Sequence, residues 1–97
     1  MEVRYADNEL ERQCTEARYM KRKLGEQRAK ALRLRLDELR KVEELGDLLH
    51  ISGKWEELKG DRAGQWSGRL TANWRVIFVP DRDCITVVVV TEITDYH

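Results

Sequence analysis

Val87-Val88-Val89-Val90, followed by Thr91-Glu92-Ile93-Thr94, is the most strongly strand-forming stretch of the chain. The four valines are apolar on both faces of a strand, and such a strand is stable where other elements cover it on both sides. We therefore predict a strand over residues 84–94 that lies inside a sheet and not at its edge.

The chain before this strand divides into further short strands. Glycines and other turn residues interrupt residues 46–83 so often that no helix fits between them. The remaining pieces are rich in β-branched and aromatic side chains, which favour strands. The expected strands cover residues 55–58, 65–70, 74–79 and 84–94, with a short strand over residues 2–5. Because short turns join the last four, we expect an antiparallel meander.

Residues 8–45 show the period of helices instead. Apolar side chains recur there at steps of three and four, which places them on one face of a helix. The first stripe consists of Leu10, Cys14, Ala17, Met20 and Leu24 and ends at Gly25. The second consists of Ala29, Leu32, Leu36, Leu39, Val42 and Leu45 and ends at Gly46. The pattern predicts two packed helices joined by a tight turn.

These elements predict an α+β fold in the order β-α-α-β-β-β-β. Two N-terminal helices pack on one face of an antiparallel-rich, twisted sheet of four to five strands. A chain of 97 residues has room for one core, so we assign residues 1–97 to a single domain.

The composition excludes several classes of protein. No apolar run approaches the roughly 20 residues that span a bilayer, and the first residues lack the apolar core of a signal peptide, so we expect a cytoplasmic protein without membrane contact. Cys14 and Cys84 are far apart and the chain has only two His, which gives neither a disulfide framework nor a zinc site. We expect both thiols to be reduced and in the core, His50 to lie in a loop or the core, and the protein to need no metal or other cofactor.

Charge is unevenly distributed although the formal net charge is zero. Zero net charge removes overall basicity as an argument for nucleic-acid binding. The segment 18–40 is nevertheless strongly basic. Its cations are either a solvated helical face or a patch that faces rRNA or a protein partner. For the second alternative the candidate ribosome-facing residues are Arg22, Lys23, Arg28 and Lys30.

A pair of arginines is expected on adjacent strands. If Thr71-Ala72-Asn73 is a three-residue hairpin loop, Leu70 pairs with Trp74 and Arg69 lies opposite Arg75 on the same face. Like charges in this position repel, so the pair suggests that an anion binds between them. The alternative is a different register, in which the arginines are apart. Glu56 or Glu57 on the preceding strand is a further possible source of neutralising charge.

The tail Asp95-Tyr96-His97 follows directly on the buried strand, which should hold it in place. Together with the facing arginines and Lys59, its side chains match what RNA cleavage by a neighbouring 2′-OH requires. One group accepts the 2′ proton, cations stabilise the charged phosphorane, and an acid protonates the leaving 5′ oxygen. Histidine suits either proton role near neutral pH, and the reaction needs no metal.

The chain resembles the HigB branch of the RelE/ParE toxin superfamily, the host-inhibition toxins of toxin–antitoxin pairs. Three stretches carry the likeness, in the order and spacing of that family: Leu58-Lys59-Gly60-Asp61-Arg62-Ala63-Gly64-Gln65-Trp66-Ser67, Asn73-Trp74-Arg75-Val76-Ile77-Phe78 and Asp95-Tyr96-His97. The helical half is similar in its pattern only.

The resemblance implies a metal-independent endoribonuclease that enters the 30S A site of the ribosome and cuts mRNA there. It also implies a cognate helix-turn-helix antitoxin of the HigA kind, through which alone the toxin reaches operator DNA. Lys59 and Arg75 match the phosphate-contacting cations of the family, and Asp95, Tyr96 and His97 match its catalytic tail. The cations expected at phosphate are Lys59, Arg62, Arg69 and Arg75.

The chain departs from the family at one position. Some members carry a His three residues before the lysine, where this chain has Glu56. Either Glu56 is the general base, a role that a carboxylate fills when its pKa is raised, or His97 moves a proton with another group. Two alternatives to a nuclease stay open: a ParE-like toxin that grips DNA gyrase or another protein, and a catalytically weak toxin that acts mainly as a co-repressor with its antitoxin.

Overall fold

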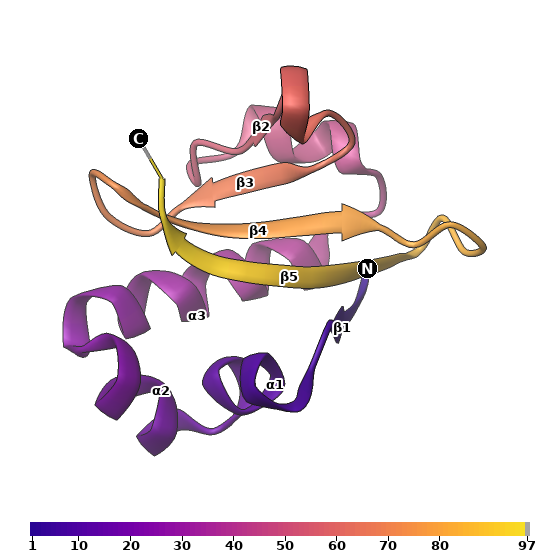
Figure 1. The fold of residues 1–97 in the computed structure, drawn as a ribbon. Helices are drawn as coiled ribbons and strands as arrows, with labels where there is room; N and C mark the ends of the chain where they lie inside the picture. The colour runs from indigo at the N-terminus through magenta and orange to yellow at the C-terminus, as the bar shows by residue number, and fades with distance from the viewer. Residues whose placement is uncertain (97) are drawn as a thin grey trace.

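The computed structural model describes residues 1–96 and has an α+β architecture with one five-stranded sheet (Figure 1). The predicted fold class is confirmed. In chain order the elements are β1 (Glu2–Tyr5), α1 (Asn8–Thr15), α2 (Ala17–Leu24), α3 (Glu26–Lys41), the 3-10 helix η1 (Leu45–His50), β2 (Glu56–Glu57), the 3-10 helix η2 (Gly60–Arg62), β3 (Trp66–Arg69), β4 (Trp74–Pro80) and β5 (Val87–Asp95).

The valine-rich strand β5 lies inside the sheet, as predicted. The strand order is β1-β5-β4-β3-β2, and Val88 and Val90 are fully buried. Strands β2 to β5 pair antiparallel, whereas β1 runs parallel to β5, with Glu2 opposite Val87. The strand begins at Val87 and not at residue 84, because Cys84 and Ile85 are exposed in the preceding turn.

The prediction that Cys84 belongs to the core is therefore wrong, although Cys14 is buried as expected. The Cys84 thiol lies 3.1 Å from the Thr86 hydroxyl. Hydrogen bonds from the side chain and backbone of Thr86 lower the pKa of this exposed thiol below its ordinary value. His50 was expected in a loop or the core, but it is exposed at the end of the 3-10 helix η1.

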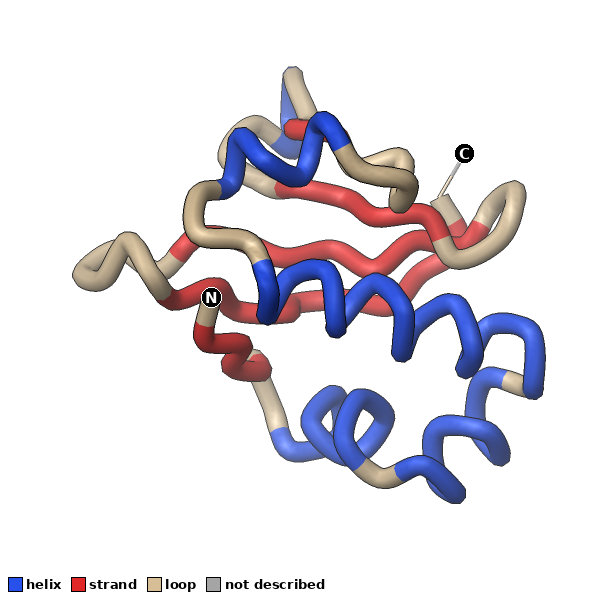
Figure 2. The backbone as a smooth tube through the Cα atoms, turned by 180° about the vertical axis from the view of Figure 1, so that it is seen from behind, coloured by secondary structure: helices blue, strands red, loops and turns tan. Residues whose placement is uncertain are grey.

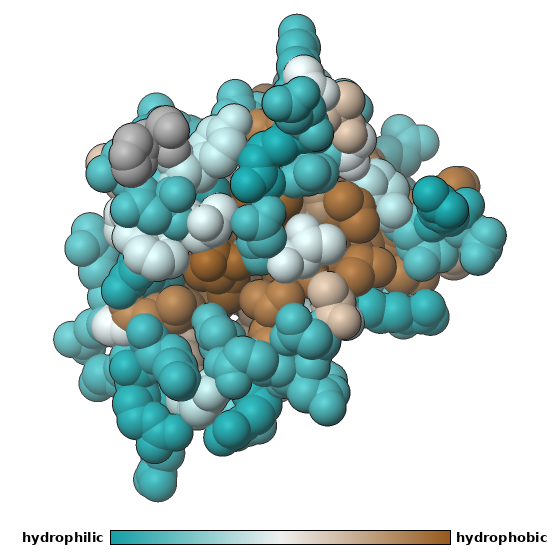
Figure 3. Space-filling view, viewed as in Figure 1, coloured by the Kyte–Doolittle hydropathy of each residue, from teal (hydrophilic) through white to brown (hydrophobic). Residues whose placement is uncertain are grey.

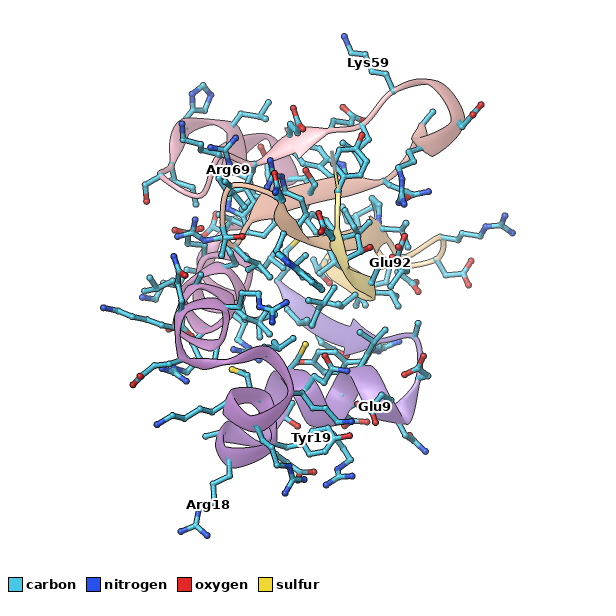
Figure 4. All side chains as sticks on the ribbon, turned by 60° about the vertical axis from the view of Figure 1, so that its left-hand side comes forward. Glu9, Arg18, Tyr19, Lys59, Arg69 and Glu92 are labelled. Atoms are coloured by element: carbon cyan, nitrogen blue, oxygen red, sulfur yellow. The ribbon has the colours of Figure 1, made fainter. Side chains whose placement is uncertain are left out.

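The N-terminal segment forms two helices where the apolar stripe predicts one. The backbone at Glu16 is extended, with φ −105° and ψ 106°, and it separates α1 from α2. This break rotates α2 so that Tyr19 becomes buried beside Met20 and Leu24. The Tyr19 hydroxyl donates to the Glu9 carboxylate over 2.7 Å, and this bond ties α2 back onto α1 (Figure 4).

The third helix is shorter than the stripe that predicts it. It ends at Lys41, and Val42 is extended, so Leu45 belongs to η1. The ammonium group of Met1 donates to the carbonyls of Leu39, Arg40 and Val42 over 2.9–3.1 Å. A positive charge at this end of a helix satisfies carbonyls that lack partners within the helix.

Helix α3 covers one face of the sheet, and α1 and α2 pack below it (Figure 2). Its buried leucines, Leu32, Leu36 and Leu39, meet Val76 and Phe78 of β4 in one core. The ring of Phe78 lies 5.7 Å from that of Trp55 and 6.0 Å from that of Trp66. We call the face that α3 does not cover the outer face. No helix in residues 1–96 is long and apolar enough to cross a bilayer.

Candidate functional site

Strand register brings the two predicted arginines together on the outer face. Arg69 lies opposite Arg75 on β4, and the amide of Leu70 donates to the Trp74 carbonyl over 2.9 Å, which closes the three-residue loop. The predicted opposition of Arg69 and Arg75 is confirmed, and the alternative register is excluded. The next outer-face row consists of Glu56, Ser67, Ile77 and Glu92.

Arg75 is held firmly at the start of β4. Its guanidinium Nη1 donates to the backbone carbonyls of Thr71, Ala72 and Trp74 over 2.9–3.1 Å. Burial lowers the pKa of Arg75 below its ordinary value, and the positive charge of Arg69 lowers it further. An arginine shifted in this way remains protonated at neutral pH, so the pair is a fixed positive site.

Glu56 is an acidic residue within electrostatic range of Arg75. Its charge raises the pKa of Arg75, against the effects of burial and Arg69. Glu56 is exposed and lies opposite Ser67 on the outer face, whereas Glu57 pairs with Trp66, whose ring belongs to the core on the other side. Of the two carboxylates that the sequence offers, the structure therefore brings Glu56 to the arginines.

Tyr96 reaches the same face from the end of β5. Its backbone amide donates to the Asn73 carbonyl over 2.8 Å, so strand pairing continues beyond Asp95, and the tail is anchored as far as Tyr96. The phenol raises the pKa of Arg75 and so lies within its electrostatic range. Asp95 is opposite Trp74 and faces the α3 side of the sheet. His97 lies outside the described residues.

Arg62 extends from η2 over the outer face. Its Nη1 donates to Glu92 over 2.8 Å and to Gln65 over 2.7 Å, and its guanidinium carbon lies 5.4 Å from the centre of the Tyr96 ring. The hydrogen bond to Glu92 raises the pKa of Arg62. Arg62 and Glu92 thus form one side of the site, with Arg69 and Arg75 on the other. Figure 3 shows this face of the molecule, with apolar surface (brown) across its middle and hydrophilic surface (teal) around it.

Lys59 does not join this group. It is exposed at the residue before η2, and its side chain points away from the sheet in Figure 4. The chain turns outward after β2, so a residue only three positions from Glu56 lies apart from it. Its expected contact with phosphate stays a prediction.

The candidate ribosome-facing cations lie on the other side of the molecule, around α2 and α3. Arg22 and Lys23 surround the Tyr19 ring at 5.2 and 5.5 Å, next to Arg12 at 3.8 Å. Arg28 stacks on Trp74 at 4.1 Å and donates to the Leu24 carbonyl, so it serves an internal contact. Lys30 is exposed.

Sequence reasoning gave no role to Ser67 or Glu92. Both belong to the outer-face row between Glu56 and the end of β5. The alternation of side chains along a strand predicts which residues of one strand share a face: Ser67 shares a face with Arg69, and Glu92 shares one with Thr94. Only the register across the strands shows that the two sets meet.

Comparison with solved structures identifies the fold. The YoeB/ParE toxin from Agrobacterium tumefaciens matches with a TM-score of 0.67 and 17% sequence identity, over 100% of both chains. The YoeB–YefM complex from Staphylococcus aureus matches with a TM-score of 0.65 and 18% identity, over 100% of this chain and 97% of the other. The chain has the fold of the YoeB toxins.

At these identities the likeness to YoeB extends to the fold alone. No protein-family model and no curated protein matches the sequence. The YoeB dimer from S. aureus is a further match, with a TM-score of 0.64. The narrower placement in the HigB branch stays a prediction.

Proposed function

We propose that this chain is the toxin of a type II toxin–antitoxin pair and that it cleaves RNA with the outer-face site. The observation that carries the proposal is the facing pair Arg69 and Arg75, with Glu56 and Tyr96 within electrostatic range of Arg75. Cations fixed before the substrate arrives stabilise charge that develops in a transition state. The YoeB fold supports the same conclusion.

The proposed reaction assigns a role to each side chain. The Glu56 carboxylate accepts the proton of the RNA 2′-OH, and the 2′ oxygen attacks the adjacent phosphorus. Arg69 and Arg75 bind the phosphate oxygens. The bond from phosphorus to the 5′ oxygen breaks, and Tyr96 or His97 supplies the proton that this oxygen takes. The products are a 2′,3′-cyclic phosphate and a free 5′-OH.

The test uses purified protein and translating ribosomes. We expect mRNA fragments that end in a 2′,3′-cyclic or 3′ phosphate. Glu56→Gln should lower the cleavage rate by about 10²-fold or more, because the amide cannot accept the proton. Glu57→Gln is the matched control. Glu57 is the neighbour of Glu56 on β2, but its side chain faces the other side of the sheet, so we expect wild-type cleavage. Intact mRNA with the wild-type protein refutes the nuclease proposal.

A neutralising partner is part of this proposal. One of the matching S. aureus structures is a heterotetrameric complex of the YoeB–YefM toxin–antitoxin. We expect the present chain to arrest growth when it is expressed alone, and a small antitoxin encoded beside it, of the helix-turn-helix HigA kind, to restore growth. Growth arrest that no neighbouring gene relieves contradicts this part.

A ParE-like activity is the second candidate, because the matching A. tumefaciens structure carries both the YoeB and the ParE name. It requires binding of DNA gyrase without RNA chemistry. Arrested DNA supercoiling with intact mRNA favours it over the nuclease. The same experiments therefore separate the two functions.

A further inference from the structure

Two buried hydrogen-bond donors on the outer face lack a partner. The hydroxyl of Ser67, a fully buried residue, and the Nε–H of Arg69 are both closed off from solvent and find no acceptor within residues 1–96. They are two residues apart on β3 and therefore point to the same side of the sheet. Native proteins satisfy nearly all buried polar atoms, so each such atom requires an explanation.

The strand register limits the side chains that face Ser67. Its two cross-strand neighbours are Ile77 on β4 and Glu56 on β2. Ile77 is apolar, so of these two only Glu56 can accept a hydrogen bond. Directly opposed side chains on antiparallel strands have Cβ atoms about 5 Å apart, a distance that a glutamate spans with a change of rotamer.

A group of the chain itself fits these donors better than the RNA phosphate does. Both atoms are closed off from solvent, so a bulky phosphodiester that arrives from solution has no access to them. Glu56 is exposed and has two oxygens with about four acceptor positions. One oxygen can accept from both donors while the other stays available to a proton.

We propose that Ser67 is a positioning residue for Glu56. The Glu56 side chain turns inward over β3, accepts hydrogen bonds from the Ser67 hydroxyl and the Arg69 Nε–H, and is thereby held beside Arg75. The inference rests on the proposed nuclease function, because it assigns Ser67 the task of aiming the general base at the 2′-OH. Ser67 itself contacts neither the RNA nor the reacting atoms.

The first experiment compares Ser67→Thr with Ser67→Val. The two side chains have nearly the same shape, so the cost of fitting either into this buried site is matched, and only threonine keeps a hydroxyl. We expect the kcat of Ser67→Thr to exceed that of Ser67→Val by about tenfold, with similar KM, as the loss of one hydrogen bond to a charged group predicts. Equal kcat values overturn the inference. If both variants fail to fold, Ser67→Ala against the wild type gives the same comparison.

A double-mutant cycle separates positioning from packing. Ser67→Ala should lower kcat in the wild-type background and leave it unchanged in Glu56→Ala, because the group that it positions is then missing. Alanine is used at position 56 because the amide oxygen of glutamine still accepts a hydrogen bond. A loss of the same size in both backgrounds shows a purely structural role and overturns the proposal.

The wild type, the two single variants and the double variant also allow a stability measurement that does not depend on cleavage. In chemical denaturation, a contact between the two side chains makes the stability effects of Ser67→Ala and Glu56→Ala non-additive. Additive effects overturn the inference whether or not the protein cuts RNA. A wild-type protein that leaves RNA intact overturns the nuclease proposal and the positioning role with it. Cleavage without a hydroxyl effect overturns the Ser67 inference alone.

Discussion

Arg69 and Arg75 face each other across two paired strands, where two positive charges repel. The repulsion is a cost to the fold, and the proposed function explains why the chain keeps it. Removing one charge should therefore move stability and activity in opposite directions. The position of both residues followed from the length of one hairpin loop, so this part of the site was predictable from sequence.

We predict that Arg69→Gln raises the free energy of unfolding by roughly 0.5 kcal/mol, because it removes a like-charge pair while its amide keeps an N–H that can donate to Glu56. The same change should lower RNA cleavage by at least tenfold. Urea denaturation and the cleavage assay measure the two effects. Arg82→Gln, at an exposed residue in the turn before β5, is the control and should change neither. A less stable Arg69→Gln protein contradicts the prediction.

Gly68 is needed because the Trp55 ring lies directly on it. A Cβ atom at this position would lie 2.6–2.8 Å from three atoms of the ring. We predict that Gly68→Ala displaces Trp55 and lowers stability by about 1–3 kcal/mol, a typical cost of overpacking. Thermal denaturation measures the loss. Gly46→Ala is the matched control, because nothing lies within 4 Å of a Cβ there, and equal losses in the two variants refute the explanation.

The sequence did not predict that Ser67 and Glu92 belong to the outer-face site, or that Lys59 lies away from it. The first two depend on which strands are neighbours, and strand order is a property of the whole sheet. Lys59 is close to Glu56 in sequence, but the left-handed φ of 66° at Gly60 begins the turn of η2, which leads the chain outward. A short separation in sequence is a poor guide where a strand ends.

At the scale of the elements, one carboxylate joins α3 to the strand that carries Glu56. Glu38 accepts a hydrogen bond from the Trp55 indole over 2.8 Å and lies 3.1 Å from Arg35 Nε. Arg35 in turn reaches the backbone carbonyl of Arg69 at 3.5 Å. These contacts fix α3 against β3 and against Trp55, the residue before β2, and so support the strand that carries Arg69.

We predict that Glu38→Ala destabilises the protein by about 2–3 kcal/mol, because it leaves the indole N–H of Trp55 without its acceptor and the guanidinium of Arg35 without its ion-pair partner. The side chains of Arg35 and Glu38 are only 12% and 19% exposed. Asp37→Ala, on the same helix, removes a pair with Arg40 whose side chains are 60% and 45% exposed. We expect Asp37→Ala to lower the free energy of unfolding by less than about 0.5 kcal/mol. Chemical denaturation of both variants is decisive.

The buried Cys14 predicts how stability depends on pH. Burial in α1 raises the pKa of this thiol to about 12, whereas a thiol in the unfolded chain ionises near pH 8.5. Cys14 therefore contributes its full stability below about pH 8.5 and loses it as the pH rises toward 12. In a Cys84→Ser background, the stability difference between Cys14 and Cys14→Ala should shrink from pH 8 to pH 11. A constant difference contradicts this.

The break between α1 and α2 shows a limit of periodicity. The apolar residues of 10–24 fit one continuous helix, and Glu16 is itself a good helix former. The break buries Tyr19, which a continuous helix would direct away from the stripe, and forms its hydrogen bond with Glu9. One continuous helix and two helices separated at Glu16 both satisfy the apolar pattern. Tertiary contacts decide between them, and the pattern alone does not predict the outcome.

At the scale of the molecule, β5 is the strand on which the sheet depends. It pairs with β1 on one side and β4 on the other, and its end carries Tyr96. The run of valines predicted this interior place, because a strand that is apolar on both faces is unfavourable at the edge of a sheet. The parallel pairing with β1 was not predicted, since residues 2–5 alternate too weakly to fix a partner.

We predict that the amides of Val88 and Val90 exchange with solvent more slowly than those of any other element, through global unfolding only. The amides of η2, an exposed single turn, should exchange by local opening. Hydrogen exchange followed by NMR measures both. Exchange of the β5 amides at the rate of η2 contradicts the view that β5 is the most stable part of the sheet.

The parallel partnership of β1 and β5 joins the earliest strand to the latest one. During synthesis, β1 waits without a partner until residues 87–95 have left the ribosome, and Tyr96 follows them. The nascent chain therefore cannot assemble the complete arginine–tyrosine site before Tyr96 has left the ribosome. Because β5 is the only strand beside β1 in the described sheet, the sheet and its site are completed together, and in the last step of folding.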